Sequence, residues 1–327
     1  MLRVLAALLA TLAALLPAAP AGAQATPEGL VGIRLLEAPT DRRDDPRAQV
    51  YVVDHVEPGD VVERRFEVSS TADRPLRVSL YAAAATVEDG EFRFGDGRAE
   101  NELTRWTTVE PGTVTVPPGG AAEGLLRITV PAGAGDGERY GVVWAEVQSA
   151  DDGTVQAVSR VGIRTYLSVG DGEEPPSDFV VDELTAVRDD AGRPVARARV
   201  TNTGGRALDM SGQLSLTGGP GGLSAGPFDA TLGTTLGIGE TAPVEVVLDP
   251  ALPDGPWEAR LVLRSGEVER QAQGRVTFTG VAQTVPLRET GGDDRLLWPA
   301  VLAAGLVTGA LLLLLLLLWR RRTARAQ

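Results

Sequence analysis

The sequence contains no cysteine, no lysine and only one histidine among its 327 residues. Without cysteine, an exported chain has no disulfide framework, no thiolate metal site and no cysteine nucleophile, so its stability must come from an ordinary apolar core. Without lysine, every basic side chain is an arginine, which also excludes lysine–asparagine cross-links. Aromatic residues make up only 5% of the chain, so the position of each one is informative.

Positive charge is also in short supply, because 44 acidic residues oppose 31 basic ones and give a formal net charge of −13. The acids lie in the middle of the chain, whereas several arginines lie at its two ends. An acidic surface disfavours nucleic acid and anionic polymers as partners. We therefore expect no nucleic-acid partner.

The longest apolar segment lies near the C-terminus, where residues 296–319 contain no ionisable side chain. As a helix this segment is roughly 36 Å long, enough to cross a hydrocarbon core of about 30 Å. Arginines are concentrated in the tail that follows, residues 320–327, which by the positive-inside rule is cytoplasmic. The sequence predicts a single-pass type I membrane protein with an extracellular body and a single span at 296–319.

The N-terminus agrees with export. Arg3 precedes an apolar run at 4–16, and the small residues 21–23 (AGA) form a cleavage site. We expect a signal peptide at 1–23. An uncleaved anchor helix is the alternative, but the apolar run is too short to span a bilayer.

Residues 287–292 (LRETGG), directly before the C-terminal apolar run, are similar to an LPxTG sorting signal. Arg288 stands where the signal has proline, and arginine does not fix φ as proline does. A retained membrane helix is therefore favoured over covalent attachment to the wall through LRETG, which remains the alternative.

Between these ends the pattern is one of short strands. In the segment 62–68, Val62, Phe66 and Val68 face one way and charged residues face the other, although Arg64 interrupts the apolar face. Similar alternation recurs at 76–80, 126–130 and 161–169, separated by Asp-Gly and other turn pairs. This period of two is typical of half-buried antiparallel strands, and many in series predict an all-β sandwich fold.

A charged, proline-containing break at 170–178 (GDGEEPPSD) divides the body in two, because no strand crosses such a segment. We expect two consecutive immunoglobulin-like β-sandwiches, at 30–170 and 177–280, followed by a short stalk at 281–295. About 100 residues with some seven strands is the size of an immunoglobulin-like domain.

Several phrases of the first sandwich together resemble the N-terminal domain of the WxL-interacting surface proteins of Gram-positive bacteria, in a divergent actinobacterial form. They are 51–59 (YVVDHVEPG), 65–70, 78–85 (VSLYAAAA), 101–107 (NELTRWT), 116–119 (VPPG) and 130–146 (VPAGAGDGERYGVVWAE). The resemblance covers about 130 residues. It implies a peptidoglycan-binding first sandwich, a second one for contacts with a partner, and a C-terminal membrane helix.

The candidate ligand-binding residues are Asn101, Arg105, Trp106 and Tyr140. An exposed aromatic ring with polar neighbours suits a sugar, because the ring packs on C–H groups while amide and guanidinium groups bind hydroxyls. Trp106 as a plug closing the sandwich core is the alternative, and the sequence favours it. Tyr140 and Trp144 lie four residues apart on one predicted strand, hence on one face, where core packing is again favoured.

No catalytic or metal site can be assembled from the sequence. His55 has no second imidazole or cysteine to complete a triad or a zinc site. Paired carboxylates such as Asp151-Asp152 and Glu173-Glu174 fall in turns and linkers, where solvated loop charge is the simpler interpretation. No EF-hand loop is present, which leaves only a weak loop calcium site open. We expect no enzyme activity, no metal and no cofactor.

These observations favour a non-catalytic, membrane-anchored envelope protein that binds peptidoglycan, another surface protein, or both. A chaperone-like assembly module for exported proteins is the first alternative, and a hydrolase with a site invisible to motifs is the second.

Overall fold

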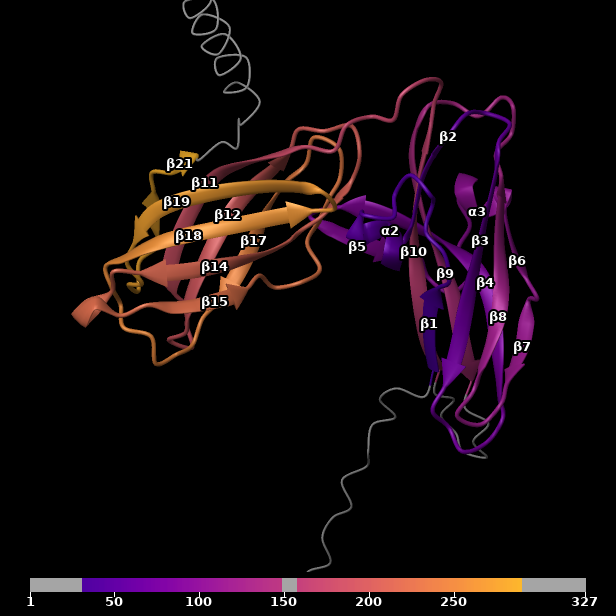
Figure 1. The fold of residues 1–327 in the computed structure, drawn as a ribbon, viewed down its shortest axis with the longest axis horizontal. Helices are drawn as coiled ribbons and strands as arrows, with labels where there is room; N and C mark the ends of the chain where they lie inside the picture. Colours follow the sequence, from indigo (N-terminus) through magenta and orange to yellow (C-terminus); the bar gives the residue numbers. More distant parts are fainter. Residues whose placement is uncertain (1–30, 149–157, 290–327) are drawn as a thin grey trace, which may run out of the picture.

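The computed structural model describes residues 31–148 and 158–289, and these form two β-sandwiches inclined to one another (Figure 1). The all-β prediction is confirmed. The predicted signal peptide 1–23, membrane segment 296–319 and tail 320–327 lie outside the described residues. Among the residues that are described, no helix is long and apolar enough to cross a membrane.

The first sandwich packs a four-stranded sheet against a six-stranded one. The four-stranded sheet has the order β1 (Val31–Leu35), β3 (Val61–Ser70), β8 (Ala121–Thr129), β6 (Thr107–Glu110). The six-stranded sheet has the order β2 (Val52–Val56), β10 (Val158–Val169), β9 (Gly137–Gln148), β4 (Leu76–Glu88), β5 (Glu91–Phe94), with β7 (Thr113–Val116) also on β4. Strand β2 runs parallel to β10, and the other pairs are antiparallel. Two short helices, α2 (Pro46–Val50) and α3 (Glu102–Trp106), connect strands.

The alternation in β3 has the predicted consequence, because Val62, Phe66 and Val68 are all buried. Arg64 lies on the same face and forms an ion pair with Asp54 of β2, a carboxylate that is itself buried. Burial raises the pKa of Asp54 above its usual value, although Arg64 opposes that effect. The charge that interrupts the apolar face is thus balanced by a second one.

The second sandwich has one sheet in the order β17 (Thr241–Val247), β12 (Pro194–Asn202), β11 (Phe179–Arg188), β20 (Gln283–Val285). The other sheet has the order β15 (Ala225–Asp229), β14 (Ser211–Thr217), β18 (Trp257–Ser265), β19 (Val268–Val276), β21 (Arg288–Glu289). A small pair joins β13 (Leu208–Asp209) to β16 (Thr235–Leu236), and a 3-10 turn, η1, spans Pro220–Gly222. Trp257 fills the centre of this core at 1% exposure, and its indole donates to the Pro253 carbonyl (2.9 Å).

The described part of the predicted stalk, residues 281–289, differs from the prediction. It contains β20 and β21, which add to the edges of the two sheets of the second sandwich. The second sandwich therefore extends past residue 280. Alternation does not reveal these two strands, because each is only two or three residues long.

A hairpin of β4 and β5 leaves the first sandwich and reaches the second at the elbow of the molecule (Figure 1). Its tip is Gly90, whose φ of 75° is a conformation that glycine adopts without strain. The Gly90 carbonyl accepts from the Thr235 N–H (2.9 Å), and the Gly90 N–H donates to Glu240 Oε1 (2.7 Å). The linker 170–178 is thus only one of the connections between the sandwiches.

Candidate functional site

Three of the predicted ligand residues, Asn101, Arg105 and Trp106, form or cap helix α3. Asn101 is the N-cap: its side-chain oxygen accepts from the Thr104 N–H (3.0 Å), and its amide donates to the Tyr140 carbonyl (2.7 Å). The polar groups of Asn101 are therefore used to fix the helix against β9. Arg105 is exposed on the last turn.

Trp106 is half-buried and packs against the core of the first sandwich. The Arg139 guanidinium lies over its ring, 4.8 Å from the centroid, and Arg139 Nε also donates to Glu102 (2.9 Å). One face of the indole therefore meets a cation that is held by a neighbouring acid, and much of the rest meets apolar side chains. This arrangement is closer to the plug interpretation than to an open platform for a sugar.

Tyr140 and Trp144 lie on one face of β9, as their spacing predicts, but that face is the outer one. There a second apolar layer covers the six-stranded sheet, and most of its ring pairs pack edge to face. The ring centroid of Phe92 lies 6.3 Å from that of Tyr140 and 5.2 Å from that of Tyr166, and the ring centroid of Phe94 lies 4.9 Å from that of Trp144. Trp144 is 5% exposed and Tyr166 is fully buried, so the layer is closed rather than open to a ligand.

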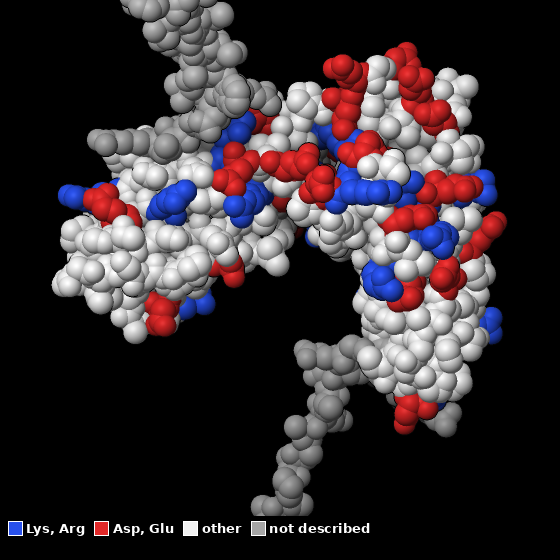
Figure 2. All heavy atoms as spheres, in the orientation of Figure 1, with Lys and Arg blue, Asp and Glu red and all other residues white. Residues whose placement is uncertain are grey.

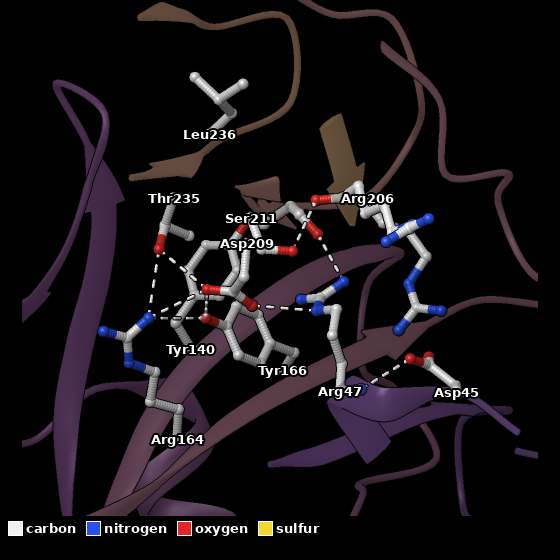
Figure 3. Close-up of polar contacts among 12 residues, drawn as sticks. Asp45, Arg47, Tyr140, Arg164, Tyr166, Arg206, Asp209, Ser211, Thr235 and Leu236 are labelled. Carbon is white, nitrogen blue, oxygen red and sulfur yellow. Dashed lines mark hydrogen bonds and ion pairs between the residues drawn. The ribbon is translucent and has the colours of Figure 1, made fainter. Parts of the chain in front are cut away.

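The layer ends at the junction of the two sandwiches, where Asp209 of β13 is the common acceptor (Figure 3). Its carboxylate accepts from Arg47 Nε (2.9 Å), Arg164 Nη1 (3.0 Å) and the Tyr166 hydroxyl (2.7 Å), all from the first sandwich. It also accepts from the Thr235 hydroxyl (2.9 Å) of the second. One carboxylate of the second sandwich thus accepts hydrogen bonds from three side chains of the first.

A second cluster lies beside it. Glu138 of β9 accepts from the Ala207 N–H (2.6 Å) and the Tyr140 hydroxyl (2.9 Å), and faces the Arg206 guanidinium (3.7 Å). Arg206 also pairs with Glu174 of the linker. Burial raises the pKa of Glu138 and lowers the pKa of Arg206 to about 10, because both charged forms lose hydration. Figure 2 shows acidic and basic side chains intermixed where the sandwiches meet.

A cavity of about 430 Å³ opens next to Asp209, between α2 and the loop around Leu232. Its arginines already have partners: Arg47 and Arg164 bind Asp209, and Arg264 binds Glu269 (2.6 Å). The cavity therefore offers a ligand little unpaired charge. The cavity lies at the bend between the two sandwiches, and a buried polar network holds the sandwiches together there.

The free edge of β10 is the most distinctive surface feature of the first sandwich. Along one side, β10 pairs with β9 over its whole length, from Val158 to Val169. Along the other, the ladder to β2 covers only Thr165 to Val169. In the described parts of the chain, residues 158–164 make no backbone hydrogen bond toward that second side. We call residues 158–164 the β10 edge.

The β10 edge is accessible and has two different faces. Val158 (54% exposed), Ser159, Arg160 and Gly162 are exposed. Toward the interior, Ile163 is buried, and the half-buried Val161 packs at the border of the core. Other edges are shorter or are interrupted. Strand β17, for example, contains a proline and accepts a bond from the Thr231 N–H at Glu245 (2.7 Å).

A side chain at Gly162 would collide with its neighbours. A Cβ there would lie 2.7 Å from ring carbon Cε3 of Trp144 and 2.7 Å from Val142. The indole of Trp144 therefore lies across the backbone of Gly162 and reaches toward the free edge of the sheet. Sequence reasoning missed this edge, because the half-length pairing of β2 leaves no sign in the alternation of β10.

His55 forms no metal-ligating group with the paired carboxylates that the structure describes, and Asp151 and Asp152 lie outside the described residues. His55 Nε2 donates to the Gly172 carbonyl (3.3 Å), and Nδ1 lies 3.2 Å from the Ser168 hydroxyl. Asp189 closes a turn by accepting from the Arg193 N–H (2.8 Å). Across the described ranges, no group of three or more metal-ligating side chains is found.

Comparison with known proteins assigns no family to the chain. The sequence matches no family model and no curated protein. Among solved structures it is similar to the YadV chaperone (12% identity, TM-score 0.40, 76% of this chain and 100% of that chain covered). It is also similar to the E. coli chaperone DraB (13%, 0.37, 80% and 96%) and to the Pseudomonas aeruginosa CupB2 chaperone (13%, 0.37, 69% and 97%). The resemblance to the WxL-interacting proteins stays a prediction.

Proposed function

We propose that this chain is a non-catalytic protein of the cell envelope that binds an extended segment of a partner polypeptide. The partner adds a strand to the six-stranded sheet of the first sandwich at the β10 edge. The single observation that supports this most directly is the run of seven residues, 158–164, whose backbone groups on one side are unpaired within the described chain. Strand addition at such an edge supplies main-chain hydrogen bonds for affinity and alternate side-chain contacts for specificity.

The shape of the edge supports the same proposal. An exposed strand edge is a template for pairing, and natural sheets usually shorten, twist or cover it. In contrast, the β10 edge is exposed at Val158 and Ser159 and has the apolar Val161 and Ile163 on its inner face. Inward side chains of an added strand would extend the core there.

The envelope location in this proposal rests on the sequence. The signal peptide at 1–23 and the membrane segment at 296–319 lie outside the described residues and stay predictions. An extracellular body with no cysteine and an acidic surface is consistent with both. Protease added to intact cells should remove that body while leaving the cytoplasmic residues 320–327 uncut.

A chaperone-like assembly role is the form of this proposal in which the partner is later released. A permanent complex of surface proteins is the other form. The two differ in lifetime: a chaperone exchanges a bound segment for a competing strand, whereas a permanent complex remains after days of competition. Peptidoglycan binding through Trp106 stays a prediction from the family resemblance, and co-sedimentation of the full chain with cell-wall sacculi tests it.

Strand addition is tested by site-directed cross-linking. Because the chain has no cysteine, Val158→Cys places one thiol on the β10 edge, and Val247→Cys places one on the edge strand β17 as a matched control. Each variant is labelled with a photoactivatable group and mixed with solubilised envelope proteins of the source cells. We expect a defined protein, cross-linked through one short segment, at position 158 alone. Equal cross-linking at both positions, or none at 158, would refute the proposal.

A further inference from the structure

The β10 edge has a definite charge pattern on its outer face. The register with β9 places Arg160 opposite Glu146, Gly162 opposite Trp144 and Arg164 opposite Val142. Arg160 and Arg164 are thus the outward side chains on either side of Gly162. No salt bridge of Arg160 is found among the described residues; its guanidinium lies 4.5 Å from the centroid of the Trp144 ring and hydrogen-bonds with the Tyr81 side chain.

This pattern opposes pairing of the edge with a second copy of itself. Antiparallel pairing of two copies centred on Gly162 would place Arg160 of each copy directly opposite Arg164 of the other. Like charges directly opposite each other destabilise an antiparallel pair, and natural edge strands use charged side chains to prevent self-association. The charges therefore permit an exposed edge without making it a dimer interface.

The same charges favour an acidic partner. Directly opposed side chains on neighbouring strands have Cβ atoms about 4.5–5.5 Å apart, and opposite charges at that distance stabilise the pair. Arg164 already donates to Asp209, so Arg160 has the larger share of this effect. On the inner face, Val161 and Ile163 require apolar neighbours, and Ile33 of β1 lies half-buried at the border of the same core.

We infer that the partner segment alternates apolar and acidic residues, with its apolar side chains facing the core and its acidic side chains opposite Arg160 and Arg164. The residue opposite Gly162 meets the indole of Trp144 and is therefore apolar or aromatic. This inference rests on the proposed function and adds to it the chemical class of the partner. The net charge of −13 repels an acidic segment. The preference for acidic residues must therefore come from the arginines of the β10 edge itself.

The test uses two fluorescent nonapeptides that alternate valine with glutamate or valine with lysine. Their binding to the full chain in detergent micelles is measured by fluorescence anisotropy at low salt. We expect the glutamate peptide to bind roughly tenfold more tightly, which corresponds to about 1.4 kcal/mol. Hydrogen exchange of the amides of 158–164 should slow when it binds.

Two variants test whether Arg160 causes the preference for the glutamate peptide. Arg160→Gln should reduce the ratio of the two affinities about threefold, because one opposed charge pair is lost. Arg77→Gln is the matched control, since Arg77 is an exposed arginine of β4 in the same sheet. It should leave the ratio unchanged.

The outcomes separate the inference from the proposed function. If both peptides slow exchange at 158–164 equally, or the lysine peptide binds more tightly, strand addition stands and the acidic partner is refuted. If neither peptide slows exchange there, the proposed function falls as well. Self-association of the chain that slows exchange at the same amides would overturn the inference in favour of a second copy.

Discussion

Removing the carboxylate of Asp209 is the sharpest test of how the two sandwiches are held together. The side chain is 16% exposed and accepts four hydrogen bonds, two of them from arginines. In Asp209→Ala, Arg47, which is 8% exposed, loses its carboxylate and keeps the Ala207 carbonyl as its side-chain hydrogen-bond acceptor (3.0 Å). Breaking a buried ion pair by removing one partner typically costs about 3–5 kcal/mol, because a charge is left uncompensated.

Three of the four donors to Asp209 belong to the first sandwich, so this cost falls on the junction and not on either core. Calorimetry of the full chain should show one cooperative transition for the wild type and two for Asp209→Ala. The matched control is Asp229→Ala, which removes an exposed carboxylate that accepts from Gln213 (2.9 Å). If the free energy of unfolding falls by less than about 1 kcal/mol in both variants, the junction network does not hold the two sandwiches together and the reasoning is wrong.

Two further predictions concern Glu138 and Trp106. Burial raises the pKa of Glu138 above 4.5, so its contribution to stability is fully present below the unfolded pKa and is lost as pH rises through the folded one. As pH rises from 4.5 to 7.5, the Tm of the neutral Glu138→Gln variant should therefore rise relative to that of the wild type. A Tm difference that does not change with pH would contradict this. Trp106→Ala should lose about 2 kcal/mol in urea unfolding, less than a fully buried tryptophan, because the ring is half-buried. A loss below about 0.5 kcal/mol with abolished binding to sacculi would instead favour the ligand role.

Much of the fold could be predicted from local alternation. The apolar face of β3 and the strands of the second sandwich follow the period of two, because side chains of a half-buried strand alternate between core and water. The interruption at Arg64 could not be explained locally, since its partner Asp54 lies on another strand. The helix at 102–106 was missed because five residues are too few for a helical period to be visible.

The junction and the free edge could not be predicted for a different reason. Arg47 and Asp209 are 162 positions apart in sequence, and Glu138 and Ala207 are 69 apart. Neither pair leaves a periodic signal, because each residue sits alone among unrelated neighbours. The β10 edge depends on where β2 stops pairing, which is a property of the fold and not of the segment itself.

Strand β4 has a mechanical consequence. It is 13 residues long, lies between β9 and β7 in the first sandwich, and ends in the hairpin whose tip is bonded to Thr235 and Glu240 of the second. A force that pulls the sandwiches apart therefore acts along β4, at right angles to the hydrogen bonds of its antiparallel ladders. Those bonds are loaded in shear and share the tension, instead of opening one after another as in a zipper. The elbow between the two sandwiches gains resistance to such a force from this geometry.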